Sequence, residues 1–124
     1  MTLETFEMEY MYDNAGDILG FRVNKPYSYK VSIELDKGII LDFDEEYVPV
    51  ALEILDASKL FDVPRYSLNN INDFRMNINI SENIIELKAS FSVLIHNKIT
   101  EEIIDTAIGN ISNFPVINRA FASV

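Results

Sequence analysis

The strongest constraint on the fold is a pair of alternating segments between residues 74 and 95. Apolar residues occupy every second position in FRMNINI and again in IIELKASFSVLI. A period of two is typical of a β-strand with one buried face. With the turn at Glu82-Asn83, every apolar residue faces another: Ile80 with Ile85, Ile78 with Leu87, Met76 with Ala89, and Phe74 with Phe91. The two segments therefore predict a β-hairpin.

The first half of the chain has the same kind of pattern in shorter pieces. Alternation predicts a hairpin over Phe6–Val23 and single strands over Tyr29–Leu35, Ile39–Phe43 and Val48–Leu55. The turns fall at 13–17 and 36–38, where Asp, Asn and Gly tolerate the required backbone. A short helix is expected over Asp56–Phe61, with Asp56 or Ser58 as its cap.

The segment Gly38–Ser58 is rich in carboxylates and raises the question of a catalytic acid pair. A turn centred on Glu45-Glu46 sets six apolar residues on one face: Phe43 opposite Val48, Leu41 opposite Val50, and Ile39 opposite Leu52. Asp42 then lies opposite Pro49, and Glu53 lies opposite Gly38, about 13 Å further along. Catalytic carboxylates of glycosidases lie roughly 5–9.5 Å apart. This register predicts that Asp42 and Glu53 are not a catalytic pair.

The last quarter of the chain is less regular. Helical spacing of apolar residues over Thr100–Ile108 favours a helix, although a strand over 99–111 stays open. The final segment FPVINRAFASV is expected to add an edge strand. Residues 64–73 form a candidate linker between a hairpin domain at 1–63 and a β-rich extension at 64–124, which we expect to pack as one unit. The fold class is mainly β, built from antiparallel hairpins with one or two short helices.

Composition narrows the function classes. The chain has 124 residues, a formal net charge of −10 and no cysteine, which excludes disulfides and thiolate chemistry. Such a charge repels nucleic acid and fits a basic protein partner or a cation. The acidic start has no apolar leader, and no apolar run approaches the roughly 20 residues of a membrane-spanning helix. We therefore expect a cytoplasmic protein that binds neither nucleic acid nor membrane.

The motifs argue against established chemistry. Asp42, Asp44, Glu46 and Glu53 fit positions one, three, five and twelve of a calcium loop. However, Tyr47 stands where that loop needs glycine, and the flanks read as strands. Weak cation binding by the turn acids stays open, so a metal site is undecided. One histidine, His96, cannot supply a triad or a zinc site alone, and we expect it in a turn. No glycine-rich nucleotide loop occurs, and we predict no cofactor and no catalytic residue.

Three pieces in order resemble the uncharacterised family called domain of unknown function 2283. They are Tyr12-Asp13-x-x-x-Asp17-x-Leu19, then Gly38-Ile39-Ile40-Leu41-Asp42-x-Asp44-Glu45, then Glu53-Ile54-Leu55-Asp56-Ala57-Ser58. The resemblance covers about residues 7–60 and implies a small β-rich domain with no established activity. Gly20, in place of an aromatic residue, and Ala51, in place of glycine, depart from the family pattern. Some members accompany small toxin-like proteins, which implies an antitoxin or regulatory partner role.

The residues that the resemblance marks as a candidate functional surface are Tyr12, Asp13, Asp17, Asp42, Asp44, Glu53 and Asp56. We rank three functions for this chain. The first is a non-enzymatic protein-interaction module, expected as a homodimer through edge strands or with a small basic partner. The second is a binder of a small ligand or divalent cation through the motif acids. The third is a carboxylate acid–base enzyme.

Overall fold

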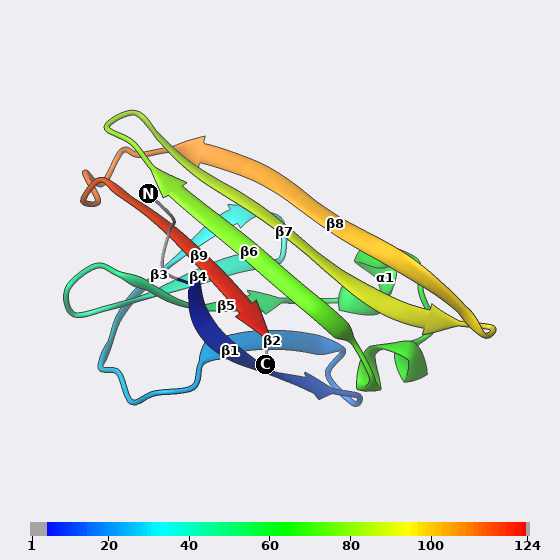
Figure 1. The fold of residues 1–124 in the computed structure, drawn as a ribbon. Helices are drawn as coiled ribbons and strands as arrows, with labels where there is room; N and C mark the ends of the chain where they lie inside the picture. Colours follow the sequence, from blue (N-terminus) through cyan, green and yellow to red (C-terminus); the bar gives the residue numbers. More distant parts are fainter. Residues whose placement is uncertain (1–4, 124) are drawn as a thin grey trace.

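The computed structural model describes residues 5–123. It shows a mainly β protein, as the alternation of apolar residues predicts. Nine strands form one sheet in the order β3-β4-β5-β2-β1-β9-β6-β7-β8 (Figure 1). Their bounds are β1 (Thr5–Asp13), β2 (Ile18–Val23), β3 (Tyr29–Asp36), β4 (Ile39–Asp44), β5 (Pro49–Ile54), β6 (Asn72–Ile80), β7 (Ile84–Ile95), β8 (Lys98–Gly109) and β9 (Ile117–Ser123). The expected short helix is α1 (Ala57–Phe61), and a 3-10 turn, η1 (Arg65–Asn69), follows it.

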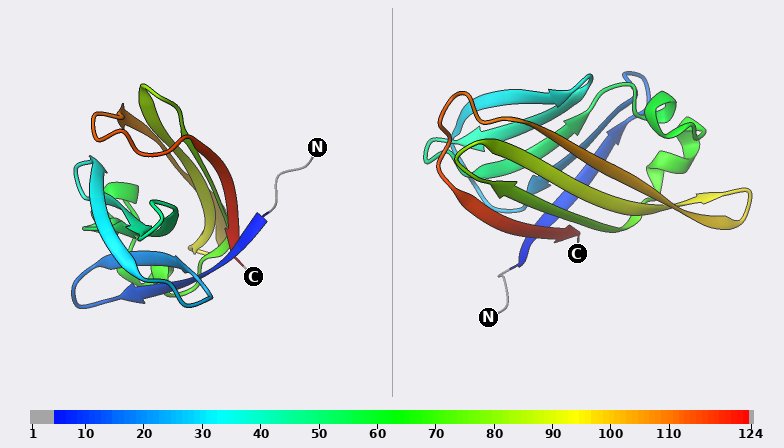
Figure 2. Two further views of the ribbon diagram at one scale, coloured as in Figure 1. Left: turned by 90° about the vertical axis from the view of Figure 1, so that its left-hand side faces the viewer. Right: turned by 90° about the horizontal axis from the view of Figure 1, so that it is seen from above.

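The sheet curls so that one face encloses the core, as the end-on view in Figure 2 shows. Five phenylalanines contribute the largest fully buried side chains: Phe21, Phe43, Phe74, Phe91 and Phe121. Phe21 of β2 stacks on Phe74 of β6, with ring centroids 3.7 Å apart. The two halves of the chain therefore bury their apolar residues in one core. The edge strands β3 and β8 approach each other without pairing.

The last strand joins the two halves of the sheet. β9 pairs in parallel with β1 and antiparallel with β6, so the expected edge position for this segment is wrong. From this central position, β9 forms backbone hydrogen bonds with both β1 and β6. The candidate linker at 64–73 contains η1, which is fastened to the first half. Arg65 Nη1 donates to the Asn14 carbonyl at 2.8 Å, and Asn14 Nδ2 donates to Asn69 Oδ1 at 2.7 Å.

The predicted hairpin of residues 74–95 is confirmed in its register. Ile80 faces Ile85, and the next two apolar pairs follow as expected. Near Phe74 a β-bulge interrupts the pairing, and Asp73 takes a φ of 56° there. Phe74 nevertheless stays in the core with 1% of its surface exposed. The bulge alters the pairing at this end and leaves the buried face unchanged.

The predicted register of the β4–β5 hairpin is wrong by two residues. Leu41 faces Leu52 instead of Val50, and Ile39 faces Ile54 instead of Leu52. A shift of two keeps every side chain on its own face, so the apolar pattern cannot distinguish the two registers. The turn sets the register of this hairpin. A longer loop between β4 and β5 and a β-bulge beside Phe43 accommodate the two residues by which the pairing is shifted.

The favoured helix over Thr100–Ile108 is wrong, because β8 pairs with β7 along its whole length. The two strands are joined by His96 and Asn97, whose φ values of 49° and 64° are those of a type I′ hairpin turn. His96 therefore lies in an exposed turn, as expected. Neither helix of residues 5–123 is long or apolar enough to cross a membrane.

Candidate functional site

The first motif piece builds a buried carboxylate at the start of β2. Only 1% of Asp17 is exposed, and three donors surround its carboxylate. The Tyr12 hydroxyl donates to Oδ1 at 2.6 Å, the Ser58 N–H donates to Oδ1 at 3.0 Å, and the Ser58 hydroxyl donates to Oδ2 at 2.7 Å. Arg65 Nε lies 4.0 Å from Oδ2. Asp17 therefore ties β1, β2 and the start of α1 together.

The same contacts set the charge states of this cluster. Burial alone would raise the pKa of Asp17, but hydrogen bonds from Ser58 and Tyr12, together with Arg65, outweigh it and lower that pKa. Burial first, and then the hydrogen bond to Asp17, raise the pKa of Tyr12 to about 12. Asp17 is thus an ionised hydrogen-bond acceptor at neutral pH, and Tyr12 is a neutral donor. This arrangement stabilises the fold, because the buried carboxylate is matched by three hydrogen-bond donors.

Asp13 and Asp56 lie near this cluster and shape the backbone. Asp13 Oδ1 accepts from the N–H groups of Ala15 at 3.1 Å and Gly16 at 3.2 Å, which closes the β1–β2 turn. Asp56 precedes α1 with a φ of 49°, and its side chain makes no capping bond. The expected cap of α1 by Asp56 or Ser58 is therefore wrong. Asp17, which is distant in sequence, accepts from the first turn of the helix instead.

Asp44 also acts on its own backbone. Its Oδ1 accepts from the Glu46 N–H at 2.8 Å and the Val48 N–H at 3.0 Å. Tyr47 takes a φ of 60° inside the same turn. Among residues 5–123, no three acidic or histidine side chains converge into a metal-binding group. Asp44 is therefore a turn residue in the geometry that the structure describes.

Asp42 and Glu53 meet on the outer face of the sheet, and their predicted separation is wrong. The two-residue shift sets Glu53 opposite Ile40 and Asp42 opposite Ala51, so the two acids become diagonal neighbours. Their side chains lie close enough for the charge of Asp42 to act on Glu53. The Ser32 hydroxyl donates to Asp42 Oδ1 at 2.5 Å, and the Tyr29 hydroxyl lies 2.7 Å from Ser32 Oγ.

The contact between these acids changes how Glu53 titrates. Burial, the charge of Asp42 and the hydrogen bond to Asp42 together raise the pKa of Glu53. Burial and the negative charge of Asp42 also raise the pKa of Tyr27, against the opposite effect of Arg22. Gly20 of β2 pairs with Glu53, so β2 has no side chain directly beside this acid.

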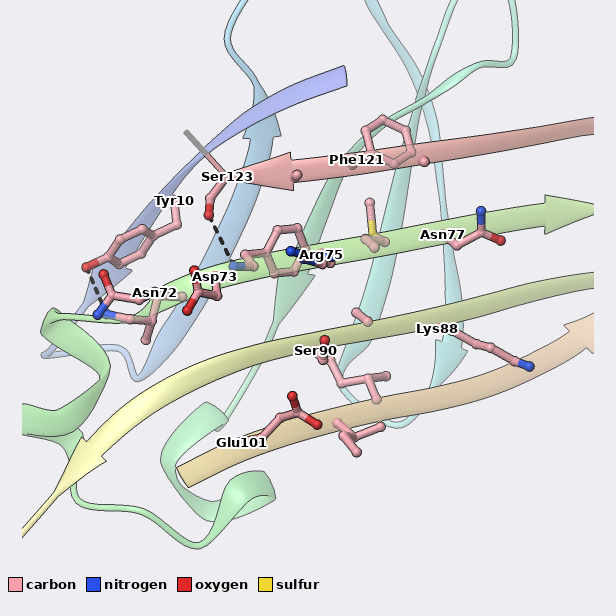
Figure 3. Close-up of a pocket in the computed structure, with 18 of the residues that line it drawn as sticks. Tyr10, Asn72, Asp73, Arg75, Asn77, Lys88, Ser90, Glu101, Phe121 and Ser123 are labelled. Carbon is pink, nitrogen blue, oxygen red and sulfur yellow. Dashed lines mark hydrogen bonds between the residues drawn. The ribbon is translucent and has the colours of Figure 1, made fainter. Parts of the chain in front are cut away.

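A wide hollow lies elsewhere, over β9, β6, β7 and β8, as Figure 3 shows. It has a volume of about 810 Å³ and contains neither Asp42 nor Glu53. Arg75 and Lys88 face it, with Glu101 at its β8 side. Sequence reasoning missed this surface because it treated residues 100–108 as a helix.

The β8 strand itself presents exposed apolar side chains that the sequence analysis did not select. Ile99 is 80% exposed and Ile103 is 66% exposed, and Leu94 of β7 lies opposite Ile99. The signal was present in the sequence, because the polar pair His96-Asn97 separates two long β-prone segments in the manner of a hairpin turn. These residues lie outside the resemblance that directed attention to the acids.

Comparison with known proteins supports the family assignment. The family described as protein of unknown function, DUF2283, matches residues 10–58. A protein of Methanosarcina mazei named "Putative hypoxanthine phosphoribosyltransferase" is 37% identical over 116 residues, which are 94% of this chain and 93% of that protein. An uncharacterized protein of Methanocaldococcus jannaschii is 39% identical over 70 residues, 56% of this chain and 60% of that protein. No solved structure gives a significant match. The chain belongs to the DUF2283 family of proteins of unknown function.

Proposed function

We propose that this protein is a non-enzymatic protein-interaction module of the cytoplasm, and that the free edge of β8 is its binding element. The observation that carries the proposal is the length and regularity of that edge. β8 pairs with β7 over twelve consecutive positions without a bulge, and it contains no proline. Unpaired, regular edge strands are templates for a further strand, and proteins without such a use interrupt them.

The hairpin geometry shows which backbone groups are free. A two-residue I′ turn makes Ile95 and Lys98 a hydrogen-bonded pair, and the hydrogen bonding then alternates along the strand. The N–H and C=O groups of Ile99, Glu101 and Ile103 therefore point away from β7. In the part of the chain that the structure describes, no hydrogen bond reaches these groups. They can pair with an added strand in the mode known as β-augmentation.

The proposal does not extend the named activity of the Methanosarcina mazei relative to this chain. Phosphoribosyl transfer needs a site for a phosphorylated sugar, and glycine-rich loops or clustered cations build such sites. Here the net charge is −10, and the four glycines are spread along the chain. An antitoxin-like or regulatory role fits the proposal, because both roles act by holding another protein.

A selection of displayed peptides tests the proposal. Random eight-residue segments are selected against the wild-type protein and against Ile103→Pro, which removes one outward N–H and leaves the β7–β8 ladder in place. Circular dichroism and the melting temperature establish that the variant is folded. We expect segments that are enriched on the wild type and lost on Ile103→Pro. Equal enrichment on both proteins would place binding away from the β8 edge and contradict the proposal.

The acid pair on β4 and β5 favours a second candidate function, a weak divalent-cation or small-ligand site. Asp42 and Glu53 are in contact, and Ser32 adds a third oxygen beside them. Hard cations prefer such oxygens. The test is thermal unfolding with millimolar calcium, magnesium or manganese, for the wild type and for Glu53→Gln. A metal-dependent rise in melting temperature that the variant loses supports this site, because a ligand of the folded state stabilises it. Equal curves with and without metal reject it.

A further inference from the structure

We infer that the segment bound along β8 comes from another protein and is an extended strand in which apolar residues alternate with lysine or arginine. This inference rests on the proposed function and adds the chemistry of the partner. It starts from the side chains on the outer face of the edge, which alternate in character: Ile99, Glu101, Ile103, Asp105. Directly opposite side chains on neighbouring strands lie about 4.5–5.5 Å apart, so an added strand would read this alternation.

Among residues 5–123, the acids of the β8 edge form no ion pair within 4.0 Å. Glu101 lies opposite Ser92, and Asp105 lies opposite Lys88 without forming an ion pair within 4.0 Å. On the inner face, Glu102 lies close enough to Asp62 of the α1 end for the two charges to interact. Acidic side chains therefore lie on both faces of the stretch Ile99–Asp105, and Lys88 is the one cationic residue directly opposite that stretch on β7. A cationic side chain on an added strand would gain an opposite charge at each of these positions.

The same alternation disfavours a second copy of this chain as the occupant. In an antiparallel pair of β8 strands, placing Ile103 opposite itself sets Glu101 opposite Asp105. Placing Ile99 opposite Ile103 sets Glu101 opposite itself. Like charges in directly opposed positions destabilise a sheet. Each chain also brings a net charge of −10 to the contact. The expected homodimer through this edge is thus the less favourable choice.

The other sheet edge provides a contrast within the molecule. β3 has irregular pairing at two places, between Tyr29 and Val31 and between Glu34 and Asp36. It also carries Lys30, a residue type that discourages strand addition at edges, whereas the one lysine of β8, Lys98, lies at the turn before Ile99. At its far end, β8 shares a small hollow with β3 that Ile33 and Ile108 line. The free stretch for a partner is therefore Ile99–Asp105, away from that contact.

The test uses synthetic peptides of nine residues, acetylated and amidated, with calorimetry near 0.15 M salt. The first peptide alternates valine with lysine, the second alternates valine with glutamate, and the third has the composition of the first with its valines and lysines in two blocks. The protein is the full chain as wild type, Ile103→Pro and Ile103→Arg. Ile103→Arg keeps the backbone N–H and adds a positive charge at an exposed position, which repels the lysine peptide. It keeps the test valid if Ile103→Pro fails to fold.

We expect the alternating lysine peptide to bind the wild type at least tenfold tighter than either control peptide. We expect Ile103→Pro and Ile103→Arg each to weaken it at least tenfold while both stay folded. Equal binding of the blocked peptide would overturn the inference, because attraction of charge alone would then suffice. Failure of every peptide to bind would overturn it as well.

Sedimentation equilibrium separates this inference from the function on which it rests. A wild-type dimer that Ile103→Pro dissociates would show that a second copy occupies the edge. That result would overturn the basic-strand inference and keep the β8 edge as a binding element. A monomer that binds the alternating lysine peptide supports both. A monomer that binds none of the peptides, with no edge-dependent segments from the selection, would overturn both.

Discussion

The two ends of the curled sheet use acidic residues in opposite ways. At the first end, which includes the family match at residues 10–58, Asp17 accepts hydrogen bonds from Tyr12 and Ser58. At the other end, Glu101 and Asp105 lie on an exposed edge without ion pairs among the described residues. The difference teaches that the acids of the family motif are largely satisfied within the fold. The exposed acids of the β8 edge lie outside the matched segment.

The largest expected effect tests whether the two ends belong to one cooperative unit. Phe74→Ala removes the ring that stacks on Phe21 across the two halves. We expect the free energy of unfolding to fall by about 4 kcal/mol, because the change leaves a cavity in the core. Urea denaturation followed by circular dichroism measures it. A single transition in the wild type supports a shared core, whereas two transitions would show that the halves unfold separately.

The next effect compares one acid from each end. We expect Asp17→Ala to cost about 3 kcal/mol, because it leaves the Tyr12 and Ser58 donors without a partner in a buried place. Asp105→Ala is the matched control on the exposed edge and should change stability by less than about 0.5 kcal/mol. Both values come from urea denaturation at pH 7. Similar costs for the two variants would remove the distinction between the ends.

The third prediction concerns Tyr12 at alkaline pH. Because its pKa is raised to about 12 in the folded state, its contribution to stability is complete below pH 10 and is lost as the pH rises from 10 toward 12. At pH 11, one unit above the usual pKa of tyrosine, about half of this contribution is lost. Melting temperatures of the wild type and Tyr12→Phe between pH 8 and 11 measure it. The variant should lose less stability over this range, and parallel curves would refute the role of the Tyr12–Asp17 hydrogen bond.

The smallest effect is a gain in stability at the acid pair. The pKa of Glu53 is raised in the folded state, so its contribution to stability is present at low pH and is lost as the pH rises through the folded-state pKa. At pH 7 the ionised Glu53 therefore repels Asp42. Glu53→Gln should raise the melting temperature at pH 7, with a gain of less than about 1 kcal/mol in the free energy of unfolding. At pH 4 it should give no gain. A loss of stability at pH 7 would contradict the contact.

Regularity of the sequence decided how much of the fold could be predicted. The β6–β7 register followed from continuous alternation and a short turn, and the structure confirms it apart from the bulge at Phe74. The β4–β5 register did not, because a slip of two residues keeps Leu41 and Leu52 on the buried face in either case. Turn geometry made the difference, through backbone bonds to Asp44 that no apolar pattern encodes.

Candidate site residues were harder to interpret than strands. Motif spacing placed Asp17 in a candidate functional surface, whereas the structure shows that it is buried and accepts hydrogen bonds from Ser58 and Tyr12. For β8, Ile103, Ile104 and Ile108 fit a helix as well as a strand in sequence. The pairing with β7 resolves this ambiguity, since a two-residue turn can deliver a full twelve-residue ladder. The local signal for this strand was the turn at His96-Asn97 and not the spacing of the isoleucines.

Hydrogen exchange along β8, followed residue by residue with NMR, tests the central claim most directly. Free edge geometry predicts fast exchange at the amides of Ile99, Glu101 and Ile103 and slow exchange at Thr100, Glu102 and Ile104. Addition of the alternating valine–lysine peptide should slow the first set without changing the second. Uniform protection of all six amides in the protein alone would contradict the account, because it would show that the edge is already paired. Unchanged fast exchange with the peptide bound would place the peptide elsewhere.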